Sequence, residues 1–442
     1  MDPTRETEAS LKEMLPAAIV QTFRNNGSIG VRVSGIVIQH FKGIDAQPES
    51  YNSYIIDSRT LDIYWKLGIY AGALKDCKQL IELSRQEEVP FYEAIASILS
   101  AYNLGIASSY WGDIPWSQAF QPDLFPQPVY DKQEDIYKEI QLLLDRAITQ
   151  LTANPEDAEA REDDLIFQGN HEAWIKTAWA LKARYTMQGS KHDPLAASKA
   201  LQYLSQAELR SIDEQARLYY GSSISESNPL TLFSIERPNQ IVLGDFLLGL
   251  LVDNQDPRLN VYAALSEDLY RIYQEDNPLI YWGQVDAAVS LISLSEAKFI
   301  AAEAHLSLGE EIQAEQAFKE AMWSNFEELG ISNDPLASQS INQQASFDRL
   351  GTFEEKLERI ITQKYIAAYG QGVNEAWVDY RRTGYPDLQV PDNVNSSFNP
   401  SLVIPQRYLY PISESNTNAS NMQAAIDRQG GHLLDDKMWL FE

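Results

Sequence analysis

The stretch that decides the fold is SLSEAKFIAAEAHLSLGEEIQAEQAFKEAM, residues 293–322. Ser293 followed three residues later by Glu296 is the capping-box pattern that begins a helix. Gly309 is expected to end this helix, because glycine readily takes the left-handed conformation of a helix terminus. The second half then places small, bulky and small side chains at helical spacing, at Ala314, Phe318 and Ala321. The stretch therefore predicts two helices that pack closely against each other.

This arrangement matches the second half of a tetratricopeptide repeat, in which a glycine makes the turn and alanines let two helices approach closely. Similar spacing occurs on three other predicted helices, at Ala73, Cys77 and Leu80, at Ile140, Leu144 and Ala147, and at Ala200, Leu204 and Ala207. Four helix pairs are therefore expected, separated by long insertions. Because a helical-repeat scaffold carries its insertions on one face, often the binding face, we expect the insertions to form the ligand side.

The whole chain, residues 1–442, is predicted to be a single unit. Helical periodicity places the paired helices roughly within 61–210 and 293–382. Irregular patterns mark the ligand-side insertions roughly at 36–57, 110–130 and 211–290, and the last of these also contains short apolar runs that predict minor strands. The expected fold class is mainly α, with tetratricopeptide-like helix pairs as a scaffold and a loop-rich ligand-binding side.

The composition excludes several classes of function. The 442 residues include 35 Lys and Arg against 63 Asp and Glu, a net charge of -28, which disfavours nucleic acid as a partner. The one cysteine, Cys77, precludes an intramolecular disulfide and the two-Cys and four-Cys zinc sites. No run approaches 18 apolar residues, so no transmembrane helix is expected.

Catalytic signatures are absent from the sequence. It contains no phosphate-binding loop, no GxGxxG, no GxSxG and no HExxH, and its 5 histidines are scattered. Carboxylate pairs carry no weight among 63 acids, because a glycosidase pair is defined by its separation in space. We therefore expect no catalytic residue, no metal site and no cofactor.

Aromatic side chains are the main sign of a binding function. The chain has 23 Tyr and 9 Trp, and an exposed ring offers a flat apolar face that suits the C–H face of a sugar. Rings that lie beside Gly or Pro without a periodic partner are candidates for such platforms. We predict six ligand-binding residues, the stacking rings Phe41 and Trp282 and their neighbours His40, Asp45, Gln47 and Tyr281. The alternative is that these rings pack inside the protein, with Trp282 filling a hole between helices.

An ordered set of motifs resembles a known family. The motifs are LGIASSYWGDIPWSQAF (104–120), YDKQEDIYKEIQLLLDRAI (130–148), HEAWIKTAWALKARYTM (171–187), DPRL (256–259), LSEAKFIAAEAHLSLG (294–309), KYIAAYGQGVNEAWVDYRRTGYPDL (364–388) and IPQRYLYPISESNTNASNMQAAI (404–426). Together they resemble the SusD/RagB-like outer-membrane lipoproteins of Bacteroidetes. The resemblance is colinear from about residue 36 to the end of the chain.

The resemblance implies a non-catalytic, cell-surface nutrient-binding lipoprotein. Such a protein covers a SusC-like TonB-dependent transporter of the outer membrane and passes oligosaccharides, or sometimes peptides, into it. The start MDPTRETEASLKEML departs from the family, because it has neither a signal peptide nor a lipid-bearing cysteine. By itself this start fits a cytoplasmic protein or a chain whose export segment has been removed. The resemblance favours the second case, with lipid anchoring in the full-length precursor.

Two alternatives from other functional classes remain open. One is a helical glycoside hydrolase or lyase with an aromatic cleft. The other is an oligopeptide-binding member of the family, or a repeat scaffold that binds peptides. The sequence names neither the glycan nor its linkage.

Overall fold

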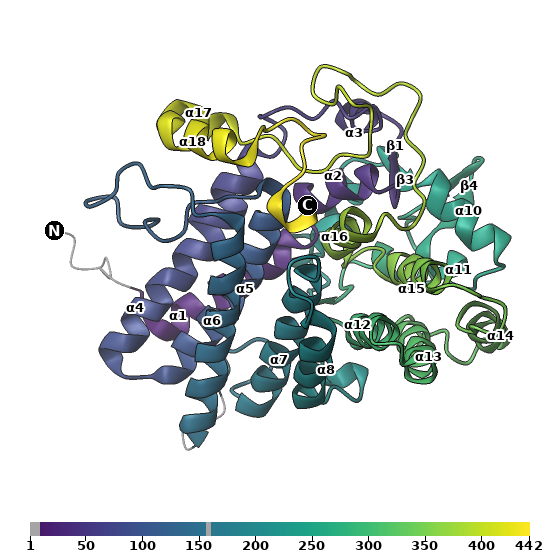
Figure 1. Ribbon diagram of the computed structural model, residues 1–442, viewed down its shortest axis with the longest axis horizontal. Coiled ribbons are helices and arrows are strands. Elements are labelled where there is room, and N and C mark those ends of the chain that lie inside the picture. The colour runs from purple at the N-terminus through teal and green to yellow at the C-terminus, as the bar shows by residue number, and fades with distance from the viewer. Residues whose placement is uncertain (1–8, 156–160) are drawn as a thin grey trace.

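The computed structural model describes residues 9–155 and 161–442 and is mainly helical (Figure 1). Four helix pairs form the scaffold, α1 (Leu11–Asn25) with α4 (Lys75–Glu87), α5 (Pro90–Trp111) with α6 (Gln133–Ala153), α7 (His171–Gln188) with α8 (Ala196–Ala207), and α12 (Leu294–Ser307) with α13 (Glu311–Glu328). They follow one another from the left of Figure 1 to its lower right. The predicted mainly α fold class is confirmed.

The other elements lie in and after the insertions. The remaining α-helices are α2 (Ile29–Val37), α3 (Ala46–Tyr51), α9 (Pro229–Glu236), α10 (Asp245–Asp253), α11 (Leu259–Tyr262), α14 (Pro335–Gln344), α15 (Phe353–Ala367), α16 (Val373–Thr383), α17 (Ile412–Thr417) and α18 (Ala419–Gln429). The 3-10 helices are η3 (Ile212–Glu214), η4 (Ile224–Glu226), η5 (Tyr281–Gly283) and η6 (Trp439–Phe441).

Short antiparallel strands join the insertions to one another. A four-stranded sheet has the order β1 (Phe41–Gly43), β3 (Ile241–Leu243), β5 (Leu269–Arg271) and β4 (Ala264–Ser266). A second sheet pairs β2 (Arg217–Leu218) with β6 (Val289–Ser290). In the first sheet Phe41 lies opposite Leu243, so the insertion at 36–57 is tied to the insertion at 211–290. Minor strands were expected in the second of these insertions, and they are present.

The fourth helix pair forms as its sequence predicts. The Ser293 hydroxyl accepts a hydrogen bond from the Glu296 amide at 3.0 Å and caps α12. Gly309 takes a positive φ of 77° between the two helices. Ala314 is fully buried, and the Ser295 hydroxyl donates to the Ala321 carbonyl at 2.8 Å across the pair. Small side chains at this interface therefore let the two backbones approach closely.

The first helix pair differs from its prediction. The sequence predicts one α-helix over 61–85, but the structure has the π-helix η1 (Tyr64–Leu74) followed by α4. Helices α1 and α2 were not predicted. Asp131 with Glu134 three residues on resembles a capping box and predicts a helix that opens at Asp131. The helix begins instead at Gln133, and the Asp131 carboxylate accepts hydrogen bonds from the backbone amides of Trp116 and Ser117, both at 2.8 Å.

Two arginines from the carboxy-terminal part of the chain donate hydrogen bonds to carbonyl groups in the last turn of α5. The Arg381 guanidinium donates to the Ser109 carbonyl at 2.6 Å, and the Arg407 guanidinium donates to the Trp111 carbonyl at 2.6 Å. The final carbonyl groups of a helix have no partner within the helix, so buried ones need donors from elsewhere. Segments distant in the sequence supply those donors here, and the central helix ends inside the protein.

Candidate functional site

The predicted stacking rings lie in the core, and the expectation that they are exposed is wrong. Phe41 is 2% exposed and Trp282 is 4% exposed. The Phe41 ring packs so closely on Gly35 that a Cβ there would lie 2.3 Å from it, and Trp282 packs in the same way on Gly370, at 2.4 Å. Pairing of β1 with β3 turns Phe41 inward, and η5 inserts Trp282 between helices. Neither ring presents a free face to a sugar.

The other four predicted residues do not come together in one site. His40 is fully buried, its Nε2 donates to the Tyr365 carbonyl at 2.8 Å, and burial lowers the pKa of His40 to about 3, so the ring is neutral. Tyr281 is half-buried with its ring edge-on to Trp282. Asp45 is exposed and caps α3 by accepting from the Ala46 amide at 2.8 Å. Of the six, Gln47 lines the open cavity described below.

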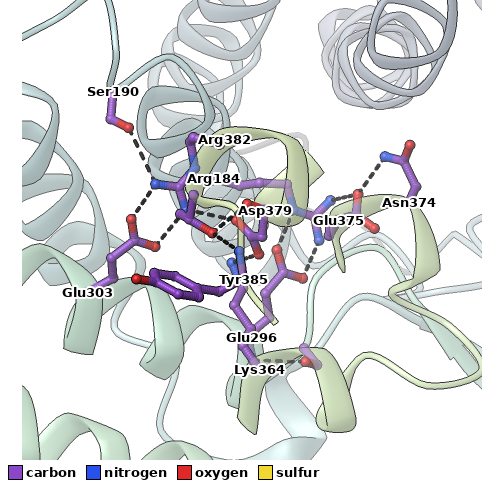
Figure 2. A network of polar contacts seen from close by, with 12 residues as sticks. Arg184, Ser190, Glu296, Glu303, Lys364, Asn374, Glu375, Asp379, Arg382 and Tyr385 are labelled. Atoms are coloured by element: carbon purple, nitrogen blue, oxygen red, sulfur yellow. Dashed lines mark hydrogen bonds and ion pairs between the residues drawn. The ribbon is translucent and has the colours of Figure 1, made fainter. Parts of the chain in front are cut away.

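A cluster of charged side chains lies between α7, α12, α15 and α16 (Figure 2). We call it the buried ion network; its members are Arg184, Glu296, Glu303, Lys364, Glu375, Asp379 and Arg382. Arg184 binds both oxygens of Glu296, at 2.7 and 2.6 Å. Asp379 is 2.7 Å from the Lys364 ammonium and 2.9 Å from the Arg382 guanidinium.

The buried ion network is structural. Burial raises the pKa of Glu375, and the nearby Glu296 adds to this rise against the opposing effect of Arg184. Burial alone would raise the pKa of Asp379 too, but Lys364 and Arg382 together lower it below its ordinary value. The adjoining cavity measures about 30 Å³, which has room for one or two water molecules. These carboxylates hold the third and fourth helix pairs against α15 and α16 and cannot receive a ligand.

An open cavity of about 600 Å³ lies where the first helix pair meets the insertions. We call it the arginine cavity, after Arg24 of α1, Arg32 of α2 and Arg237 after α9. Residues of α3, η1 and β3 complete its walls. Its volume is in the range of a site for a small oligosaccharide.

The walls of the arginine cavity combine apolar and polar groups. The apolar part includes the half-buried ring of Phe233, the exposed side chains of Ile63 and Leu67, and the largely buried rings of Tyr51 and Tyr64. Leu67 is 60% exposed, so its side chain is accessible to a ligand in the cavity. The polar part includes the amide side chains of Gln21, Asn25, Gln47 and Gln240. Such a wall can bind both the C–H face and the hydroxyl groups of a sugar.

Sequence reasoning missed this cavity because three of its walls come from helices that it did not predict or from far along the chain. Arg24 and Arg32 lie on α1 and α2, and Arg237 follows α9. The chain has 63 acidic residues and 35 Lys and Arg, so a cluster of three arginines is an unusual feature that could have marked the cavity. No spacing in the sequence, however, connects Arg237 with the amino-terminal arginines.

The fold and the sequence define an outer-membrane-associated class of binding protein. The family model SusD-like_2, described as "Starch-binding associating with outer membrane", matches residues 3–411. The chain therefore belongs to the SusD-like family. A search of curated proteins finds no match.

Solved structures share the fold over nearly the whole chain. A SusD/RagB family protein from Bacteroides thetaiotaomicron VPI-5482 is 24% identical, with a TM-score of 0.81 and coverage of 98% of this chain and 99% of that one. A chitin-binding SusD homologue from Flavobacterium johnsoniae is 21% identical, with a TM-score of 0.78 and coverage of 97% and 98%. A further structure, of a chitin-binding protein, is 23% identical, with a TM-score of 0.79 and coverage of 98% and 100%. At these identities the likeness concerns the fold alone.

Across 9–155 and 161–442, no group of three or more His, Cys, Asp and Glu side chains is arranged to hold a metal ion. Within the same ranges, every helix is too short or too polar to pass through a bilayer.

Proposed function

We propose that this chain binds an oligosaccharide at the cell surface and delivers it to a SusC-like TonB-dependent transporter. Membership of a family described as starch-binding and associated with the outer membrane supports this proposal. Two relatives of the same fold are named as chitin-binding, which also favours a glycan as the ligand. The proposal includes a lipid anchor on the full-length precursor, as the family resemblance implies.

The arginine cavity is the site we propose for the glycan. The observation that carries this assignment is an open cavity of about 600 Å³ whose walls bring rings, apolar side chains and amides together. A sugar needs both kinds of contact, because one side of its ring carries C–H groups and its edge carries hydroxyls. Gln47 lies in the wall and Asp45 close to it, at the start of α3, so these two predicted ligand contacts are retained in the proposal.

The alternative of a glycoside hydrolase is less well supported by the cavity. Most glycosidases need two carboxylates on opposite sides of the scissile bond. Among the described residues that line the arginine cavity, Glu236 is the one carboxylate. We therefore propose binding without cleavage, and we expect weak affinity, with a Kd of about 1 μM to 1 mM, because a protein that hands its ligand on must also release it.

Calorimetric titration against a panel of glycans and peptides tests this function. We expect a glycan to bind and the change Leu67→Asp to weaken it at least about tenfold, because a charge would replace an apolar wall. Leu195→Asp is the matched control, since Leu195 is 59% exposed but lies at the start of α8, outside the cavity. Peptide binding without glycan binding would contradict the proposal.

Two further measurements test the rest of the proposal. Co-expression with a SusC-like barrel should give a complex that purifies together, and its absence would contradict delivery. Incubation of the protein with the bound glycan should release no shorter product. Measurable cleavage would instead support the hydrolase or lyase alternative.

A further inference from the structure

Three arginines of the arginine cavity have no carboxylate partner. Within the part of the chain that the structure describes, Arg24, Arg32 and Arg237 form no ion pair at 4.0 Å or less. Glu236 lines the same cavity, yet it too forms none. The chain has 63 acids and 35 bases, so partners for arginine are abundant. In the buried ion network Arg184 and Arg382 have such partners, whereas the buried Arg381 and Arg407 donate to backbone carbonyl groups instead.

Arg32 is held without an anion. It is half-buried, and its guanidinium lies 4.1 Å from the centre of the Phe233 ring. One hydrogen bond, a long one of 3.5 Å, runs from it to the Gly27 carbonyl. The pKa of Arg32 is lowered to about 10, chiefly by burial, which Tyr51 opposes and Arg237 reinforces. Arg32 and Arg237 line the same cavity and repel each other, and an anion bound between them would relieve that repulsion.

Tyr51 provides an independent observation at the same place. This side chain lines the cavity and is 4% exposed, and its hydroxyl has no hydrogen-bond partner among the described residues. An unpaired buried hydroxyl costs free energy, so native structures generally supply a partner. Burial raises the pKa of Tyr51, and Arg32, which lines the same cavity, opposes this rise. Among the described residues the Tyr51 hydroxyl has no acceptor, and Arg32 has the one long hydrogen bond to Gly27.

We propose that the arginine cavity selects an acidic oligosaccharide, whose carboxylate or sulfate oxygens lie between Arg32 and Arg237. This inference rests on the function proposed above and names the class of glycan. Guanidinium groups match both anions, because their parallel N–H groups donate to two oxygens at once. The rings and amides of the same walls contact the rest of the sugar. A ligand with the anionic group alone would fill only a part of the cavity.

The overall charge makes this selectivity local. A net charge of -28 repels an anionic ligand at long range, so attraction must come from the cavity itself. Salt screens exposed charges that lie further apart than about 8 Å at physiological ionic strength. We therefore expect added salt to reduce the distant repulsion more than the contact with Arg32, which is half-buried.

The test compares three related probes by calorimetric titration. Trigalacturonic acid carries carboxylates, a sulfated galactotriose carries sulfates, and galactotriose is neutral. Wild-type protein should bind at least one acidic probe about ten or more times more tightly than the neutral one. The carboxylate and sulfate arms show which anion is preferred.

Arginine variants test whether the preference for an acidic probe arises from Arg32 and Arg237. Arg237→Gln and Arg32→Gln should each weaken the acidic probe by about 10-fold to 100-fold and the neutral probe by less than about threefold. Arg210→Gln is the control, because Arg210 is exposed, pairs with Glu208 and lies outside the cavity. Arg237 is exposed, so its variant keeps the test valid even where Arg32→Gln unfolds.

The outcomes separate this inference from the function on which it rests. Equal affinity for the neutral and acidic probes, unchanged by either arginine variant, overturns the inference and leaves glycan binding intact. Tight binding of triglutamate with no binding of either acidic sugar overturns it in favour of an acidic peptide. A full glycan panel that gives no binding at all overturns the proposed function itself.

Discussion

The buried ion network and the arginine cavity use the same side chain in opposite ways. In the network, Arg184 and Arg382 each bind two carboxylates, and the space beside them holds little more than a water molecule. In the cavity, Arg32 and Arg237 have no acid within ion-pair distance among the described residues, and about 600 Å³ is open in front of them. Paired cations in a closed space hold helices together. Unpaired cations at an open space remain available to a ligand.

The largest expected effect is a loss of stability when the buried ion network is broken. Arg184→Met leaves Glu296 and Glu375 buried without their cation. Breaking one partner of a buried ion pair costs about 3–5 kcal/mol, so we expect a loss of this size in the free energy of unfolding. Chemical denaturation measures it. A loss below about 1 kcal/mol would mean that this network does not hold the helix pairs together.

Trp282→Ala should cost a similar amount, about 3–5 kcal/mol, because it opens a cavity in the core. Trp282 is buried against Gly370 in the structure. Thermal unfolding together with glycan titration distinguishes the two roles considered for this ring. Unchanged stability with lost glycan affinity would restore its assignment as a stacking platform.

The third prediction concerns pH and the network. The pKa of Glu375 is raised in the folded protein, so its contribution to stability is complete below the unfolded value near 4.5 and is lost as pH rises through the folded value. Glu375→Gln removes this dependence. We expect the stability of the variant relative to wild type to increase from pH 4.5 to pH 7.5 in denaturation curves. A constant difference over this range would contradict the raised pKa.

Arg32→Met should change stability by less than about 1 kcal/mol. The variant loses a contact with the Phe233 ring, worth roughly 0.5–1 kcal/mol, and also loses the repulsion by Arg237. No carboxylate is left unpaired, unlike in Arg184→Met. Denaturation of the two variants side by side tests the comparison directly, and equal losses would remove the distinction between the two sites.

The smallest effect is expected at Tyr51. Tyr51→Phe removes a buried hydroxyl that has no partner among the described residues, so it should be neutral or stabilise by up to about 1 kcal/mol. Thermal unfolding without ligand measures this. Marked destabilisation would show that the hydroxyl has a partner in the unliganded protein, such as a bound water.

Sequence reasoning predicts the helix pairs best where local signals and packing agree. Ser293, Gly309 and Ala314 each determine one step of the fourth pair, and all three behave as predicted. The segment of α2, IGVRVSGIV, is instead rich in glycine and β-branched residues that favour other structures. Contacts with α16 and α3 hold it as a helix, and such contacts are not visible in the sequence.

The site is harder to predict than the fold for the same reason. Phe41 and Trp282 lie outside helical periodicity, but a lack of periodicity does not distinguish an exposed ring from one buried by a short strand or turn. The register of β1 against β3 decides the position of Phe41. Arg32 and Arg237 come together only when α2 and α9 pack. Neither relation can be deduced without the tertiary structure.

The closure of α5 also bears on the order in which the chain folds. Contacts between neighbouring helices of a pair are local and form quickly, whereas contacts that join distant segments close large loops and slow folding. Arg407 and Trp111 are 296 positions apart, and the Ser34 and Tyr408 hydroxyls, which lie 2.8 Å from each other, are 374 positions apart. During synthesis the helix pairs can therefore assemble from the amino terminus while the end of α5 still lacks its donors. The Ser109 and Trp111 carbonyl groups wait for donors until residues 381 and 407 have been made.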